Sequence, residues 1–392
     1  MGLWMPGAAK GDAMHVIRTM RQAAMVAAGL AAGLAASSPA WGQLSTIKDR
    51  AYFGVNRPIP IQVTVPKAEV VPAPEAPAEA PKEGEPPAAP TQVVKPAGEV
   101  RIDLFEVGRE GAVATAPVLA DLPVDLAGLF PVLWQGPMPK LRYAQLVVAG
   151  KEVGAPLVLQ PMISEARAKL VDPKSRRLWF RDPTTNEDNF RPREGVMEWV
   201  TEPPAYAGLR IYTDQHVILE TSLGDMEFRL RPDAAPNSVW NIRELVRLGF
   251  YNDIIFHRIV PTLASGHPFV VQVGDPTGTG DGGPGYSIDL ERSNLPHDFG
   301  VLSLARSDDP DTNGSQIFIA LSREGTARLD GLYTAFGEMV RGTETLVALS
   351  RVTVKDQRPV DPPILKSARL IDAPSWSSRP ARVVRPVERP GR

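Results

Sequence analysis

The sequence predicts a mainly β protein with two β-rich regions, and three observations support this fold class. Short runs of alternating apolar and polar residues, separated by glycine-containing turns, recur over much of residues 99–373. Only three short stretches favour helices. The 40 prolines among 392 residues exceed the average usage of about 5% and indicate linker-like stretches.

Composition and spacing argue against several kinds of site. Cysteine is absent, which excludes disulfides, thiolate metal ligands and a cysteine nucleophile. The formal net charge of −2 gives no reason to expect a nucleic-acid partner. The five histidines lack metal-ligand spacing, and Ser315 has no partner pattern for a hydrolase triad. The glycine-rich run Gly278–Gly285 is not followed by a helix or lysine, so it is no phosphate cradle.

The N-terminal residues 1–42 resemble a signal peptide. Arg18 and Arg21 precede the apolar, small-residue run Ala23–Ala36, and Ala40–Gly42 supplies a small-residue cleavage pattern. The run is too short for a good membrane span, which needs about 20 apolar residues. We therefore expect export, most simply to the periplasm, with no transmembrane span after cleavage. The alternative is an uncleaved helix that anchors the protein.

Residues 43–98 are expected to form a linker that is mostly disordered. Pro72–Pro90 consists mainly of Pro, Ala and Glu and has no aromatic residue, so it cannot bury enough apolar surface to offset chain entropy. We interpret it as an extended spacer of polyproline type. Asp49–Pro66 is either one short strand or an interaction segment.

Residues 99–205 are expected to form a β-rich accessory domain whose partner the sequence does not indicate. Strands are predicted at Val100–Val107, Leu141–Val148, Pro156–Met162 and Arg177–Arg181, and one helix at Ser164–Leu170. Short strands separated by turns predict a small sandwich or barrel.

The C-terminal region has a more regular pattern. A hairpin is predicted from His216–Thr221 and Gly224–Leu230. A helix should begin at Pro236, with Asn237 or Ser238 as its cap, and stop at Gly249. Further predicted elements are a helix at Thr343–Ser350 with Thr343 as N-cap, a closing strand at Pro363–Leu370, and a basic, disordered tail over 374–392.

Several motifs occur in a fixed order within this region. They are FHRIVP from Phe256, FVVQVGD ending at Asp275, an alanine at 305, NGSQIF at Asn313–Phe318, LDG at 329–331 and FG at 336–337. Together they resemble the cyclophilin-type peptidyl-prolyl isomerases. The resemblance covers about residues 214–373 and implies a closed eight-stranded barrel capped by two helices. It also implies proline-containing polypeptide substrates and no cofactor or metal.

The isomerase chemistry needs a donor rather than a nucleophile. Rotation about an X–Pro bond is opposed by amide resonance, with a barrier of about 18–20 kcal/mol. A donor aimed at the prolyl nitrogen stabilises the twisted amide, and an apolar slot holds the ring. The resemblance assigns the site to Arg258, Phe269, Gln272, Phe318, Leu329, Tyr333 and His257. It assigns the neighbouring groove to Val270, Ala305, Arg306, Gln316, Ile317 and Arg328.

Arg258 is the expected donor because its guanidinium is permanently charged and rigid. Strict strand alternation would place Phe269 and Gln272 on opposite faces, so we expect a bend or bulge between them. We expect His257 to orient or pack rather than carry a proton, because isomerisation moves none.

The chain departs from the family pattern at the rim of the groove. Thr262–Pro268 replaces a single residue and predicts a longer loop beside the slot. Arg306 stands in place of the usual Asn. Arg328 stands in place of Trp, so weak cyclosporin affinity is expected. The run Arg306–Asp311 adds acidic residues, and these charges either bias the groove toward charged peptides or form a solvated rim.

Three functions are consistent with these patterns. The first is an exported prolyl isomerase. The second is a proline-peptide binding protein that kept the groove and lost rate through the longer loop and Arg306. The third is an envelope interaction protein that acts through residues 99–205.

Overall fold

The computed structural model describes residues 42–47, 50–65, 70–71, 93–94, 98–135, 140–163, 167–171, 178–179, 196–200 and 206–386. Residues 1–41 of the predicted signal peptide, the spacer Pro72–Pro90 and the last six residues lie outside the described part. The described residues from Gly42 onward belong to one compact unit. None of their helices is long and apolar enough to cross a membrane.

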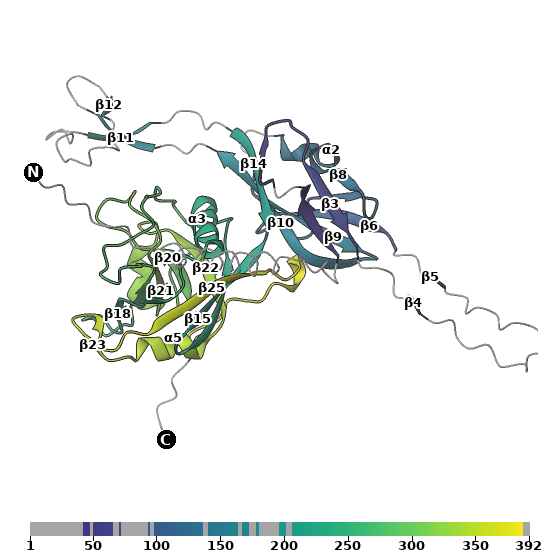
Figure 1. Ribbon diagram of the computed structural model, residues 1–392. Coiled ribbons are helices and arrows are strands. Elements are labelled where there is room, and N and C mark those ends of the chain that lie inside the picture. The colour runs from purple at the N-terminus through teal and green to yellow at the C-terminus, as the bar shows by residue number, and fades with distance from the viewer. Residues whose placement is uncertain are drawn as a thin grey trace, which may run out of the picture. The chain divides into compact units, whose positions relative to one another are not determined.

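The C-terminal half contains one strongly curved sheet (Figure 1). Its strand order is β17-β25-β15-β16-β22-β20-β21-β19-β18. The strands are β15 (Gln215–Thr221), β16 (Gly224–Leu230), β17 (Ile254–Ile255), β18 (Arg258–Val260), β19 (Val270–Val273), β20 (Val301–Leu304), β21 (Ile317–Ala320), β22 (Ala335–Arg341) and β25 (Ile364–Asp372).

The sheet closes through a single short piece of chain. Ile254 and Ile255 pair with β25 at one edge, and Arg258–Val260 pairs with β19 at the other edge. Because β17 and β18 are separated by two residues, they act as one bent strand that joins the two edges. The predicted eight-stranded barrel is therefore confirmed, with its eighth strand divided into two, and closure leaves few exposed edges.

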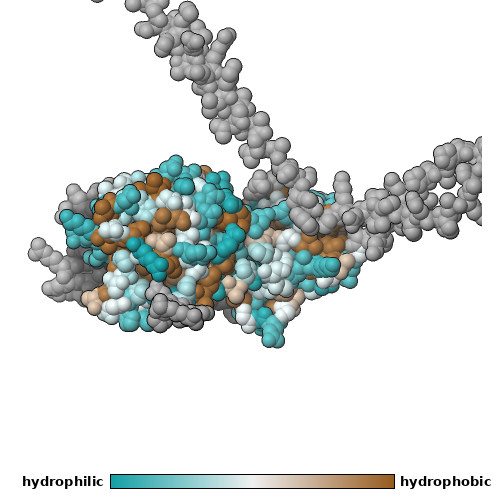
Figure 2. Space-filling model, turned by 90° about the horizontal axis from the view of Figure 1, so that it is seen from below, coloured by the Kyte–Doolittle hydropathy of each residue, from teal (hydrophilic) through white to brown (hydrophobic). Residues whose placement is uncertain are grey.

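Two helices pack against the interior of this barrel. Figure 1 shows α3 (Pro236–Arg247) and α5 (Thr343–Ser350) at opposite ends of it. Val239 and Ile242 of α3 and Leu346 of α5 join the same buried cluster as the barrel strands. On the face seen in Figure 2, hydrophobic and hydrophilic residues are interspersed, as expected when the main apolar cluster lies inside.

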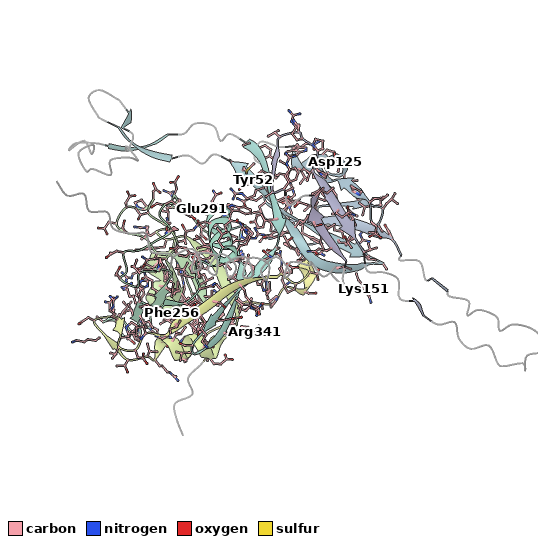
Figure 3. The ribbon with its side chains drawn as sticks, in the orientation of Figure 1. Tyr52, Asp125, Lys151, Phe256, Glu291 and Arg341 are labelled. Carbon is pink, nitrogen blue, oxygen red and sulfur yellow. The ribbon has the colours of Figure 1, made fainter. Side chains whose placement is uncertain are left out.

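The predicted caps of both helices are wrong. The N-cap of α3 is Ala235, and the side-chain acceptor is Glu291, which lies beside the helix in Figure 3. The Glu291 carboxylate accepts hydrogen bonds from the backbone N–H groups of Asn237 at 2.9 Å and Ser238 at 2.6 Å. Pro236 occupies the first helical position, where its missing N–H costs nothing. The N-cap of α5 is Gly342, whose φ of 99° favours glycine.

The N-terminal half is a sandwich, as the sequence suggested, but it begins earlier than expected. A three-stranded sheet has the order β1-β3-β8, and a six-stranded sheet has the order β2-β14-β10-β9-β6-β7. Apolar residues of both sheets form one buried cluster. The strands are β1 (Gln43–Thr46), β2 (Tyr52–Gly54), β3 (Pro60–Thr64), β6 (Val100–Phe105), β7 (Ala114–Pro117), β8 (Pro123–Asp125), β9 (Arg142–Val148), β10 (Lys151–Ile163) and β14 (Tyr206–Thr213).

The predicted domain boundaries at 99 and 205 are therefore corrected. Strands β1, β2 and β3 come from the expected linker, and β14 follows position 205. Within the linker, β4 (Val70–Val71) and β5 (Val93–Val94) also pair with each other. The short helices α2 (Leu126–Leu129) and η2 (Pro131–Leu133) follow β8.

The helix predicted at Ser164–Leu170 is also wrong where the structure describes it. Residues Arg167–Val171 form strand β11, which lies between β12 (Leu178–Trp179) and β13 (Val196–Val200). One antiparallel partner, β12, follows closely in the sequence, but the other, β13, is distant, so local periodicity could not predict the three-stranded pairing.

The beginning of the C-terminal tail is ordered, in contrast to the prediction. Residues Trp376–Ser378 form a 3-10 helix, η5. The Trp376 ring stacks on Phe105 of β6, with ring centres 5.1 Å apart. Arg379 lies over the Trp376 ring and pairs with the buried Asp214 at 2.6 Å. Aromatic and guanidinium contacts thus hold a proline- and arginine-rich segment that composition alone describes as disordered.

Candidate active site

Three neighbouring strands place the predicted site on the outer face of the barrel. Arg258 of β18 lies opposite Gln272 of β19, which lies opposite Phe318 of β21. Their strand neighbours Ile259 and Val271 belong to the main barrel core. Alternation along each strand therefore turns one set of residues into the core and presents the other set as a row outside it.

The prediction that Ile317 lines the groove needs correction. Its side chain is 2% exposed and belongs to the main barrel core. It precedes Phe318 in β21, and Phe318 belongs to the outer cluster, so alternation turns Ile317 inward. Ile317 does not line the groove.

The residues expected to line the proline slot gather in a compact apolar cluster. Its buried members are Val260, Phe269, Val270, Phe318 and Leu329, and its partly buried members are Leu263, Ala305 and Tyr333. Phe269 lies just before β19, which begins at Val270, and it joins the same cluster as Val270. The pairing of β19 is regular, so no bulge occurs between Val270 and Gln272. The structure thus brings together four of the predicted site residues, Phe269, Phe318, Leu329 and Tyr333, and two predicted groove residues, Val270 and Ala305.

Arg258 is held at the side of this cluster by two glutamines. Its Nε donates to Gln357 Oε1 at 2.9 Å, and its Nη1 donates to Gln272 Oε1 at 3.2 Å. A guanidinium has five N–H donors, so three remain without a hydrogen-bond partner among the described residues. Burial lowers the pKa of Arg258, which the nearby Tyr333 opposes, but an arginine remains charged at neutral pH.

A relay of amides fixes Gln272 in turn. Gln272 Nε2 donates to Gln316 Oε1 at 2.8 Å, so its carbonyl oxygen is left to accept from Arg258. Gln316 Nε2 donates to the carbonyl oxygens of Gly280 and Gly282, both at 2.8 Å. The glycine-rich run Gly278–Gly285, which lacks the features of a phosphate site, therefore fixes this series of hydrogen-bonded glutamine amides.

Asp275 holds the glycine-rich loop in this position. Its carboxylate accepts hydrogen bonds from the Thr277 N–H and hydroxyl, both at 2.7 Å, and from the Gly280 N–H at 2.6 Å. Burial by itself raises the pKa of Asp275, but these hydrogen bonds outweigh it and hold the pKa well below its usual value. Asp275 is thus ionised at neutral pH and can hold the loop as an acceptor.

His257 is buried next to this relay. Its side chain is 4% exposed, and neither ring nitrogen has a hydrogen-bond partner by geometry. Burial lowers the pKa of His257, against the opposing effect of Asp275, so the ring is neutral near pH 7. This environment fits a packing residue better than a cationic donor.

His297 and Gln357 were not predicted from the sequence. The His297 ring is buried, contacts Asp330 Oδ1 at 3.0 Å and Ser303 Oγ at 2.9 Å, and stacks on Phe318. Asp330, the partner of His297, directly follows Leu329 in the LDG motif. That motif was the one sequence signal that pointed to this contact. Gln357 lies on the hairpin of β23 (Val354–Lys355) and β24 (Arg358–Pro359), for which no motif exists.

Two arginines and the longer loop form the rim. Arg306 lies over the Tyr333 ring, with Cζ 4.5 Å from the ring centre, and Arg328 lies over Phe269 at 5.0 Å. The loop at Thr262–Pro268 is closed by a hydrogen bond from the Leu263 N–H to the His267 carbonyl at 2.9 Å. Leu263 packs against the slot, whereas His267 is exposed.

Comparisons with known proteins agree with this geometry. The family model "Cyclophilin type peptidyl-prolyl cis-trans isomerase/CLD" matches residues 216–370. The chain is 40% identical over 165 residues to peptidyl-prolyl cis-trans isomerase-like 1 of Emericella nidulans, covering 41% of this chain and 96% of that protein. It is 44% identical over 121 residues to peptidyl-prolyl cis-trans isomerase B of Bacillus subtilis, covering 30% of this chain and 78% of the relative.

Two further matches cover a similar share of this chain. Peptidyl-prolyl cis-trans isomerase-like 2 of Cryptococcus neoformans is 38% identical over 168 residues, which is 28% of that protein's length and 41% of this chain. A crystal structure of a Cryptosporidium parvum cyclophilin-type isomerase, determined in the presence of the dipeptide Ala-Pro, is 35% identical. It covers 40% of this chain and 99% of that chain, with a TM-score of 0.37.

This chain belongs to the cyclophilin-type peptidyl-prolyl cis-trans isomerase family, a family of isomerase enzymes, through its C-terminal half. The resemblance read from the motifs is thereby confirmed. Among the described residues, no group of three or more His, Asp or Glu is arranged to hold a metal ion.

Proposed function

We propose that this protein is a peptidyl-prolyl isomerase that accelerates rotation about X–Pro bonds with Arg258 as its donor. The observation that carries the proposal is the position of Arg258. Its guanidinium is held by Gln357 and Gln272 beside an apolar slot, with three N–H groups left over.

The mechanism follows from differential binding of the twisted amide. When the X–Pro bond leaves planarity, the prolyl nitrogen regains its lone pair and becomes an acceptor. An N–H of Arg258 then donates a hydrogen bond to that nitrogen. In the planar ground state the same nitrogen is a much poorer acceptor, so the bond favours the twisted state. Phe269 and Phe318 hold the ring while the preceding carbonyl rotates. No proton is transferred, so the neutral state of His257 is compatible with activity.

We also propose that the substrates are extended X–Pro segments of exported proteins, in the periplasm. The support is the charged, apolar and small-residue pattern of residues 1–42. A fusion of residues 1–42 to a reporter that folds only outside the cytoplasm tests this. Loss of reporter activity on replacing Arg18 and Arg21 with Glu supports export, and a reporter that stays inactive with the natural segment contradicts it.

The activity is tested with the full chain on an Ala-Pro tetrapeptide, followed by protease coupling or by NMR exchange. Acceleration above the uncatalysed rate, which is tens of seconds to minutes per event, is expected. Absence of acceleration by the folded protein contradicts the proposal.

A second candidate function is a proline-peptide binding protein with little catalysis. The observation in its favour is Leu263, which the longer loop packs against the slot, where substrate must rotate. This candidate predicts peptide binding by isothermal titration without acceleration in the isomerisation assay. Clear acceleration removes it.

A further inference from the structure

The mouth of the slot carries positive charge on two sides. Arg306 stacks on Tyr333, and Arg328 stacks on Phe269, so each aromatic wall has a guanidinium on its face. Both rings contribute to the apolar cluster that is expected to hold the proline. A charged residue of a bound peptide would therefore meet these groups close to the reacting bond.

Neither guanidinium is paired with a carboxylate in the described structure. Arg306 donates to the backbone carbonyl oxygens of Ser307, Asp308 and Leu332, at 2.7–3.3 Å. These bonds fix its position and leave its charge uncompensated. Arg328 is exposed, and its contact in the described residues is the Phe269 ring.

Two of the neighbouring acidic residues, Asp309 and Asp311, accept hydrogen bonds from backbone N–H groups. The Asp309 carboxylate accepts from the Asp311 N–H at 3.0 Å, and the Asp311 carboxylate accepts from the Leu290 N–H at 3.0 Å. The exposed Asp308 contacts Arg306 through its carbonyl oxygen, at 3.3 Å. Since the described contacts of Arg306 and Arg328 are with backbone carbonyl oxygens and aromatic rings, a ligand carboxylate can approach both guanidinium groups.

A stacked guanidinium keeps its N–H edge free for a planar, two-point contact with a carboxylate. Residues next to the proline lie about 3.8 Å apart along the peptide, so a side chain one or two positions away can reach the rim. We propose that this groove selects prolyl segments that carry Asp or Glu within two residues of the proline. Arg328 pairs with the carboxylate, and Arg306 contributes the surrounding positive field.

This inference rests on the proposed isomerase function, and its test separates the two. Peptides identical except for Glu, Gln or Lys are compared, with the variable residue two before the proline in one set and one after it in another. We expect kcat/KM to follow the order Glu, Gln, Lys in at least one set, with Glu over Lys by about threefold to tenfold, the range for one or two exposed ion pairs. The difference should shrink between 0.05 M and 0.5 M NaCl, because screening shortens the range of the attraction.

The double variant Arg306→Gln, Arg328→Gln should bring the Glu-to-Lys ratio close to one. Arg247→Gln is the matched control, because Arg247 is an exposed arginine of α3 paired with Glu244, away from the slot, and it should leave the ratio unchanged. Equal kcat/KM for all charges overturns the inference while the isomerase function stands. If no peptide is accelerated, the isomerase function fails, and titration of the same peptides decides the inference: equal affinities overturn it.

Discussion

Replacing Gln357 with Ala should slow catalysis because it removes one of two side chains that hold the donor. Arg258 Nε donates to Gln357 Oε1 at 2.9 Å, and the Gln357 carbonyl accepts from the Ile259 N–H at 2.8 Å. The substitution removes the side-chain bond and keeps the backbone bond. Hydrogen bonds to charged groups contribute about 1.5–3 kcal/mol when buried, and this contact is exposed, so we take about 1 kcal/mol. That corresponds to a fall in kcat of about fivefold.

The assay is isomerisation of an Ala-Pro tetrapeptide, with kcat and KM measured separately. A group that acts on the twisted amide should lower kcat and leave KM nearly constant. Lys355→Ala in the same hairpin is the matched control, since the described contacts of Lys355 do not include Arg258. Gln357 has φ of 66°, which alanine adopts no more easily, so both glutamine and alanine carry similar backbone strain there. Unchanged kcat in Gln357→Ala, with the fold intact, refutes the idea that this glutamine positions the donor.

Three further predictions concern stability. Glu291→Ala should lower the free energy of unfolding by about 2 kcal/mol, because it removes a charged acceptor from the N-terminus of α3. In urea unfolding, Glu291→Gln should have a stability between those of the natural protein and Glu291→Ala. Equal stability of these three proteins contradicts the capping role of Glu291. Burial lowers the pKa of both His257 and His297 below the ordinary histidine value of about 6.5 that holds in the unfolded chain, so the unfolded chain binds more protons than the folded one as the pH falls. The free energy of unfolding should therefore decrease as the pH drops from 7 to 5 and stay level above about 7.5. Stability that rises on acidification contradicts this. Trp376→Ala should lower stability by about 1–2 kcal/mol in thermal unfolding, because the half-buried ring loses its contacts with Phe105 and Tyr143; an unchanged unfolding temperature shows that the tail is held by other contacts.

The barrel and the site residues could be predicted because the motifs resemble the cyclophilin pattern, whereas periodicity alone predicts single strands and not the pairing of distant ones such as β15 and β25. FHRIVP and FVVQVGD contain adjacent strands, and alternation separates Ile259 and Val271 in the core from Arg258 and Gln272 outside it. Phe269 does not follow this alternation, because it lies with Val270 in the outer cluster. The one wrong groove residue, Ile317, was taken from its place in a motif without applying that alternation.

The features that were missed depend on contacts between distant parts of the chain. Glu291 accepts from the N–H of Asn237, 54 residues earlier, so no local capping rule includes it. Gln357 reaches Arg258 across 99 residues from a turn whose Asp-Gln sequence is unusual for two consecutive positive φ angles. Strand β2 pairs with β14, which is why the start of the sandwich was taken for linker. These contacts become visible only when the whole chain is folded.

The most direct test of the account is the rate of X–Pro isomerisation by the full chain and by its Arg258→Ala variant. Both proteins should show the same far-UV circular dichroism and similar thermal unfolding, since Arg258 lies at the outer face of β18. The account predicts clear acceleration by the natural protein and a loss of at least about a hundredfold in kcat/KM in the variant, as is typical when a single transition-state donor is removed. A folded Arg258→Ala protein with full activity would contradict it.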